Sequence, residues 1–125
     1  MRVLLDTHLL LWWQADDERL SAEARQLILS AEAVVVSSVS VWEVGIKHGL
    51  GKLSVGAARV WQTAQEDGFV GLPFTALHAL AVTELPDLHK DPFDRALVSQ
   101  SLNEPLILLT ADAQVAQYGG TVRRV

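Results

Sequence analysis

The sequence contains no cysteine, and this absence removes several chemistries at once. No disulfide, cysteine zinc site or thiolate nucleophile is possible in this chain. Such a composition is compatible with the reducing cytoplasm, where we expect the protein, without proving that location. The N-terminus has no charged segment followed by a long apolar stretch and a small-residue cleavage site, so no signal peptide is expected. No apolar run approaches the roughly 18 residues of a membrane span, so we expect no membrane contact.

Signatures of nucleotide binding and phosphotransfer are missing as well. The chain has no P-loop and no G-x-G-x-x-G, and nucleotide cofactors are therefore not expected. The run Asp6-Thr7-His8 lacks the second carboxylate of the Asp-x-Asp motif in haloacid-dehalogenase-like phosphatases. A receiver-like domain would need an acidic pair after the first strand and a central phosphoacceptor aspartate, and neither is evident.

Positive charge is in short supply, with 10 Lys and Arg against 15 Asp and Glu and a formal net charge of −5. This is globally the wrong sign for non-specific binding to nucleic acid. It suits a protein that gathers carboxylates around a cation, or one that binds a basic partner. Half of the 125 residues are hydrophobic, which is enough for a single domain over residues 1–125 with a core that needs no disulfides.

Short apolar runs alternate with helical segments along the whole chain. The runs 3–5, 34–36 and 106–109 show no polar alternation, which is typical of strands buried on both faces of a parallel sheet. A short strand or extended link is expected over 69–74, and a final edge strand over 121–125. Helices are expected over 7–14, 21–31, 38 or 40 to 48, 56–67, 75–83, 92–102 and 112–118. In the helix over 75–83, Leu77, Leu80 and Ala81 are expected to form the apolar stripe. The fold class is therefore α/β with a mainly parallel central sheet.

Four carboxylates occupy equivalent positions in this pattern. Asp6 and Asp112 follow strands, whereas Glu43 and Asp94 lie in the first turns of helices. Ligands of open α/β sheets sit outside the carboxyl ends of the strands, so all four are expected at one edge. Clustered carboxylates repel one another unless a cation neutralises them. Hard divalent ions such as Mg²⁺ and Mn²⁺ prefer oxygen ligands and commonly bridge to substrate phosphates.

Helix capping is the simpler alternative for each of these side chains. Asp6 can cap the helix that begins near Thr7. Ser40 and Glu43 have the spacing of a capping box, unless the helix begins near Ser38 and leaves Glu43 free. In the stretch Asp91-Pro92-Phe93-Asp94, the proline suits the first helical position and makes Asp91 the N-cap. If all the carboxylates were only caps, the protein would be a non-catalytic binding module.

Two further features concern surfaces. The segment from Val44 to Trp61 contains Lys47, Lys52 and Arg59 and no Asp or Glu, which makes it the place where we expect phosphate contacts. A solvated basic loop is the alternative.

Trp12 and Trp13 are adjacent on a helix, about 100° apart, and cannot share one core-facing stripe. Either one of them lies at a surface or interface, or both are partly buried.

At this point the chain resembles a known family. The stretches concerned span nearly all of it: Leu4-Leu5-Asp6-Thr7-His8, Ser37-Ser38-Val39-Ser40-Val41-Trp42-Glu43-Val44, His89-Lys90-Asp91-Pro92-Phe93-Asp94-Arg95 and Leu109-Thr110-Ala111-Asp112. In order and spacing they resemble the PIN-domain family, in particular the VapC-type toxins of type II toxin–antitoxin modules. The resemblance implies a PIN-like three-layer α/β/α sandwich.

The resemblance also implies the chemistry. It points to an endoribonuclease dependent on Mg²⁺ or Mn²⁺ that hydrolyses RNA with a metal-activated water. Asp6, Glu43 and Asp94 match the three core acidic positions of the family, and Asp112 matches a more variable fourth. Thr7, Ser38 and Thr110 match polar positions that often line the pocket, and Asp91 lies nearby as the expected cap.

The implied partners are an RNA substrate, a second copy of the chain in a homodimer, and a cognate antitoxin protein that covers the cleft. A PIN-like nuclease that processes RNA or acts on DNA, without being a toxin, remains the alternative, because metal-assisted phosphodiester chemistry is the same for both polymers.

Overall fold

The fold is described here from a computed structural model that covers residues 1–125. Five strands form one sheet in the order β3-β2-β1-β4-β5, and every neighbouring pair is parallel. The strands are β1 (Arg2–Leu5), β2 (Ala33–Ser37), β3 (Val70–Leu72), β4 (Ile107–Thr110) and β5 (Val122–Arg124). The expectation of a mainly parallel sheet with the last strand at an edge is confirmed.

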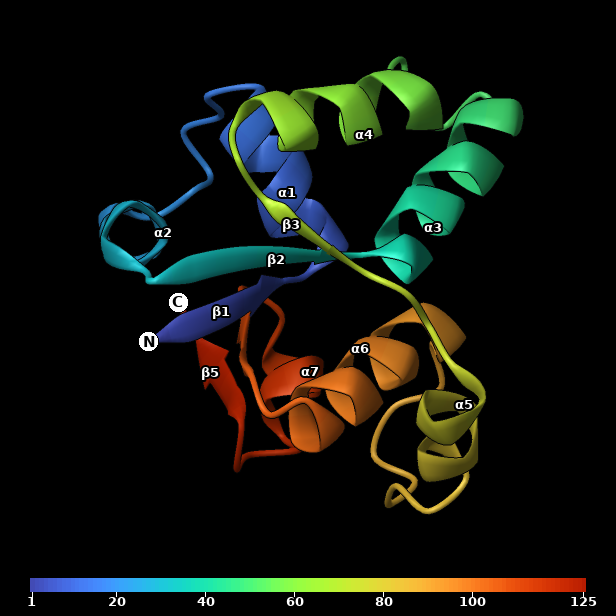
Figure 1. The fold of residues 1–125 in the computed structure, drawn as a ribbon. Coiled ribbons are helices and arrows are strands. Elements are labelled where there is room, and N and C mark those ends of the chain that lie inside the picture. Colours follow the sequence, from blue (N-terminus) through green and yellow to red (C-terminus); the bar gives the residue numbers. More distant parts are fainter.

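Seven helices cover the two faces of this sheet. They are α1 (Thr7–Gln14), α2 (Ala22–Ser30), α3 (Ser38–Gly49), α4 (Ala57–Glu66), α5 (Ala76–Val82), α6 (Pro92–Asn103) and α7 (Ala113–Ala116). Helices α1 to α4 lie on one side and α5 to α7 on the other, which gives three layers (Figure 1). All seven expected helices are present within a few residues of their expected bounds, and α7 is shorter than expected.

Strand residues alternate between two separate cores. Val3 and Leu5 pack with α1, α2 and α4, whereas Leu4 between them packs with Ala96 and Leu97 of α6. Strand β2 repeats this division between its two faces. Because helices cover both faces, the three inner strands β2, β1 and β4 need apolar residues at consecutive positions. This is the physical reason for the unbroken apolar runs in the sequence.

The strand order creates a crevice beside the central strand. From β1 the chain builds outward through β2 to β3, and later places β4 and β5 on the other side of β1. The connections that leave β1 and β4 therefore diverge at their carboxyl ends, where open α/β sheets hold ligands. Asp6 directly follows β1, and Asp112 lies two residues beyond β4. The topology thus brings residues from both ends of the chain to one place.

One packing prediction is wrong. Leu77 and Leu80 were expected, with Ala81, to form the apolar stripe of α5, but their exposed fractions are 74% and 65%. The side chain buried beneath α5 is His78, whose Nδ1 accepts the Thr75 N–H and whose Nε2 lies 2.6 Å from Glu104. A hydrogen-bonded imidazole holds this short helix against α6, and the leucines are left on the surface.

Of the two arrangements expected for Trp12 and Trp13, the structure has the one in which both are partly buried. Trp12 and Trp13 are both half-buried: the indole N–H of Trp13 donates to Asp67, and the guanidinium of Arg19 lies over Trp12. The indole that faces solvent is Trp42 on α3, with an exposed fraction of 63%. No helix reaches the combination of length and apolarity that crossing a membrane requires.

Candidate active site

Asp6 lies at the bottom of the crevice and also caps a helix. Its Oδ1 accepts the Leu9 N–H at 2.8 Å and its Oδ2 accepts the Thr110 hydroxyl at 2.6 Å. Burial raises the pKa of the Asp6 carboxyl above its ordinary value, and the charge of Glu43 acts in the same direction. The two hydrogen bonds and His8 oppose that rise in pKa. Capping and membership of a carboxylate cluster are therefore compatible for this residue.

Glu43 projects from the second turn of α3 toward the end of β1. The helix begins at Ser38 with Ser37 as its N-cap, so the capping box between Ser40 and Glu43 does not form, and that alternative is wrong. Glu43 is 3% exposed and accepts the Thr7 hydroxyl at 2.6 Å. Its other oxygen accepts from the Lys47 ammonium at 2.5 Å. Both carboxylate oxygens thus have fixed donors.

Asp94 lies in the first turn of α6. As expected, Asp91 is the N-cap, and its Oδ1 accepts the N–H groups of Phe93 and Asp94. Burial raises the pKa of Asp94 to about 6, and the charges of Asp91, Asp6 and Glu43 contribute to the rise. A hydrogen bond from His89 lowers it in part. The carboxylates after β1, in α3 and in α6 therefore lie close enough for the charge of one to raise the pKa of another.

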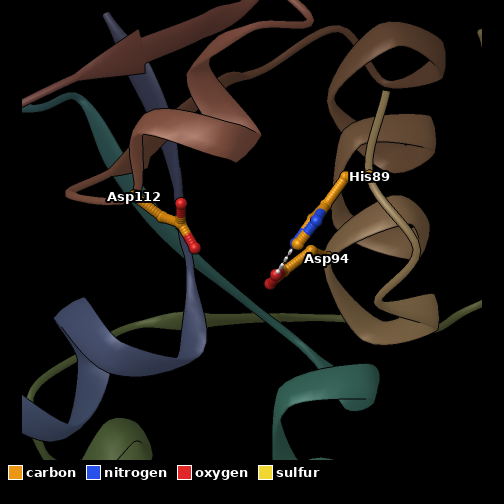
Figure 2. Close-up of side chains that lie close together, drawn as sticks. All are labelled: His89, Asp94 and Asp112. Carbon is orange, nitrogen blue, oxygen red and sulfur yellow. Dashed lines mark hydrogen bonds and ion pairs between the residues drawn. The ribbon is translucent and has the colours of Figure 1, made fainter. Parts of the chain in front are cut away.

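Asp112 is the exposed member of the group. It caps α7 by accepting the Gln114 N–H at 2.8 Å, and its own N–H donates to the Thr110 hydroxyl oxygen. One ligand atom from each of His89, Asp94 and Asp112 lies within 4.8 Å of the other two. Figure 2 shows the Asp112 carboxylate facing the other two side chains, which meet through a hydrogen bond.

Comparison with known proteins identifies the family. The model of the PIN domain matches residues 3–120. This chain belongs to the PIN-domain family. It is 28% identical to "Ribonuclease VapC22" of Mycobacterium tuberculosis over 120 residues, which cover 93% of this chain and 91% of that protein. The family expected from the sequence motifs is therefore confirmed.

Solved structures show the same fold. VapBC2 from Rickettsia felis, bound to a DNA fragment from its promoter, matches with a TM-score of 0.70 at 15% identity, covering 99% of this chain and 98% of that one. A toxin–antitoxin complex from Klebsiella pneumoniae matches with a TM-score of 0.69 at 16% identity, covering 98% and 99%. These likenesses confirm the three-layer α/β/α architecture of this PIN domain.

Two residues near the cluster differ from the sequence expectation. The hydroxyl of Ser38 accepts the Phe74 N–H at 3.0 Å, so it faces the link after β3 instead of the carboxylates. The hydroxyl beside Thr7 and Glu43 belongs to Ser40, 3.0 Å from Thr7 Oγ1. Positions two apart on a helix point about 200° apart, so a helix that begins at Ser38 presents only one of these serines to the crevice.

His89 was not singled out from the sequence as a site residue. It lies on the loop before α6, and its Nε2 is 2.8 Å from Asp94 Oδ2. A histidine five residues before an aspartate in a loop carries no periodic signal. The one signal in the sequence is that His89 begins the stretch from His89 to Arg95, which resembles the PIN-domain family.

The donor set of this PIN domain fits a divalent cation. Asp6, Glu43, Asp94 and Asp112 supply carboxylate oxygens, which are the ligands that hard divalent ions prefer. The raised pKa values of Asp6 and Asp94 show that the protein alone does not fully stabilise their ionised forms. A bound cation would supply the missing positive charge.

Proposed function

We propose that this PIN domain is a divalent-metal-dependent endoribonuclease, the toxin of a type II toxin–antitoxin pair. The observation that carries the proposal is the gathering of Asp6, Glu43 and Asp94 in one cluster at the strand-order switch, where Asp6 and Glu43 are buried and the carboxyls of Asp6 and Asp94 have raised pKa values. The relative named a ribonuclease and the similar toxin–antitoxin complexes support both parts of the proposal.

We assign the four carboxylates to holding the ion. The Leu9 N–H and the Thr110 hydroxyl fix Asp6, while Thr7 and Lys47 fix Glu43, so the two deep side chains need no reorganisation when a cation enters. The other two, Asp94 and Asp112, stand at the open side. When bound, the cation lowers the pKa of a water and stabilises the charge that builds on the phosphate.

Hydrolysis by water defines the products. Because the nucleophile is water, the RNA 2′-hydroxyl is not needed for the chemistry, and the ends are a 5′-phosphate and a 3′-hydroxyl. We assign the RNA backbone to Lys52, which is exposed after the end of α3, to Arg59, which is exposed in the first turn of α4, and to Lys47, which also pairs with Glu43. These three cations give an acidic protein a local place for phosphates.

Two surfaces suit protein partners in the cytoplasm, where RNA is available. A hollow of about 540 Å³ beside Trp42 is lined mainly by apolar groups, including Trp61, Leu72 and Pro73, and it adjoins the helix that carries Glu43. We assign this hollow to the antitoxin. The exposed leucines of α5, Leu77 and Leu80, are a separate apolar surface that we assign to the homodimer.

The deciding experiment is cleavage of end-labelled single-stranded RNA by the pure protein with Mg²⁺ or Mn²⁺, with and without chelator. Cleavage should require the metal, leave 5′-phosphate ends and be lost in Asp6→Asn and Glu43→Gln. Leu29→Asp, which replaces an exposed residue of α2, is the control and should cleave RNA like the wild type. Full activity in chelator, or 2′,3′-cyclic phosphate ends, would overturn the metal-activated-water mechanism. Equal cleavage of a matched DNA strand would point to the broader nuclease alternative.

A further inference from the structure

We propose that His89 is a positioning residue: its imidazole N–H fixes the Asp94 carboxylate for the cation, and Arg95 in turn holds the loop that presents His89. The inference rests on the proposed metal-dependent cleavage and adds two residues to it. Neither side chain belongs to the four carboxylates of the cluster.

The contact itself is short and sheltered. His89 Nε2 lies 2.8 Å from Asp94 Oδ2, and the two side chains are 14% and 19% exposed. An ionised carboxylate only accepts hydrogen bonds, so Nε2 carries the proton in this contact. The bond occupies one oxygen of Asp94 and leaves the other available to a cation. Of the four carboxylates, Asp94 receives its side-chain hydrogen bond from an imidazole, which can donate without carrying a charge.

That difference matters for a cation site. Glu43 is held by the ammonium group of Lys47, and Asp6 by the neutral hydroxyl of Thr110. A second ammonium or guanidinium on Asp94 would repel the incoming ion, because like charges at such distances cost free energy. Carboxylates that bind metals are themselves usually held by hydrogen bonds from surrounding residues. A neutral N–H donor meets both requirements.

Arg95 supports this arrangement from behind. Although it follows Asp94 directly, its guanidinium pairs with none of the clustered carboxylates. Its Nη1 donates to the carbonyls of Pro86 (3.1 Å) and His89 (3.4 Å) and to the Tyr118 hydroxyl (2.9 Å). Its Nη2 donates to the carbonyl of Val82 at 3.1 Å. One planar group thus ties both ends of the loop between α5 and α6 to helix α6.

A competing role for His89 is direct ligation. Neighbouring ligand atoms around an octahedral ion with bonds of roughly 2.1 Å are separated by about 3 Å, close to the observed 2.8 Å. The two roles predict different behaviour for glutamine. Its side-chain amide can place an N–H near the position of Nε2, so it can replace a hydrogen-bond donor but not a nitrogen ligand.

The test compares His89→Ala, His89→Gln and the control His48→Ala, an exposed histidine at the end of α3, in the full-length protein. Calorimetry measures the Mn²⁺ dissociation constant, and RNA cleavage gives kcat and KM. His89→Ala should weaken Mn²⁺ binding by about 10–100-fold and lower kcat with little change in KM. His89→Gln should recover most of both losses, and His48→Ala should match the wild type. Melting in chelator verifies that each variant is folded.

Arg95→Lys provides the second arm. It keeps the charge but cannot reach the same acceptors, so Mn²⁺ binding should weaken, and less than additively when combined with His89→Ala. Unchanged binding in His89→Ala would overturn the proposal. Failure of His89→Gln, together with a nitrogen coupled to Mn²⁺ in pulsed EPR of the wild type, would also overturn it in favour of ligation. If the wild type neither binds metal nor cleaves RNA, the proposed function is wrong, and the role of His89 that depends on it is wrong as well.

Discussion

The hydroxyl of Thr110 donates a 2.6 Å hydrogen bond to Asp6 and so joins residues 104 positions apart across the strand-order switch. Replacing Thr110 by Val should remove a donor that lowers the Asp6 pKa and destabilise the metal-free protein by about 1–3 kcal/mol at pH 8. The loss should shrink in acid, because a protonated Asp6 depends less on that donor. Chemical denaturation in chelator at pH 8 and pH 4 measures both values.

Thr121→Val is the matched control for that experiment. Its hydroxyl lies 2.7 Å from Ser101 and has no carboxylate partner, so its loss should cost the same at both pH values. A pH-independent effect in Thr110→Val would contradict the role assigned to this hydrogen bond.

Asp94→Asn should abolish cleavage but stabilise the metal-free fold above pH 6. The folded protein holds the Asp94 proton with a pKa of about 6, against 3.8 for an ordinary carboxyl, so wild-type stability falls as the pH rises between these values. Asn cannot ionise and escapes that loss. After allowance for solvent screening, the gain should be about 1–2 kcal/mol. Urea melts from pH 4 to pH 8 in chelator test it, and a net loss of stability would favour a purely structural Asp94.

Substitutions of Lys47, Lys52 and Arg59 should all weaken RNA binding, but only that of Lys47 should also lower the stability of the protein. Lys52→Ala and Arg59→Ala should weaken RNA binding for all sequences, each reducing the salt slope by roughly 1, without moving the cleavage positions. Lys47→Ala should in addition destabilise the protein by about 1–3 kcal/mol, because it leaves the buried Glu43 carboxylate without its cation. Filter binding over a salt series and thermal melts measure the two effects. Arg124→Ala, on the edge strand β5, controls for loss of one positive charge; an equal effect there would refute a localised patch.

Leu80→Asp should dissociate the proposed homodimer. The side chain is 65% exposed on α5 beside Leu77, and a buried aspartate at an interface has no compensating partner. Sedimentation equilibrium should show at least a tenfold weaker dimer, whereas Leu29→Asp, with a side chain 63% exposed on α2, should leave it unchanged. Wild-type protein that stays monomeric at high concentration would refute the dimer itself.

The order and type of almost every helix and strand could be predicted from the sequence. Strands covered on both faces appear as unbroken apolar runs, and the residues that cap helices mark where the helices begin. It could not decide how Glu43 points. Either Ser37 or Ser40 is a competent N-cap, and the three-residue difference determines whether Glu43 bonds back to its own helix or reaches Thr7.

Tertiary relationships were harder to predict. Leu77 and Leu80 have the spacing of a core stripe, yet both are exposed, because spacing along a helix does not determine which face of the helix packs against the core. His89 meets Asp94 through a loop whose backbone carbonyls accept hydrogen bonds from Arg95, and neither contact leaves any periodicity in the sequence.

Strand β1 is synthesised before the other four strands, yet it occupies the centre of the sheet, and one of its two partners is β4 at residues 107–110. A growing chain that has not reached this point lacks one wall of β1, the hydroxyl donor to Asp6, and Asp112 itself. Contacts of such long sequence separation form late, because the closing of the loop must precede them. While the ribosome is still translating the first hundred or so residues, the nascent polypeptide therefore has no assembled site. Any nuclease activity can begin only after residues 107–112 have been synthesised and have joined the fold.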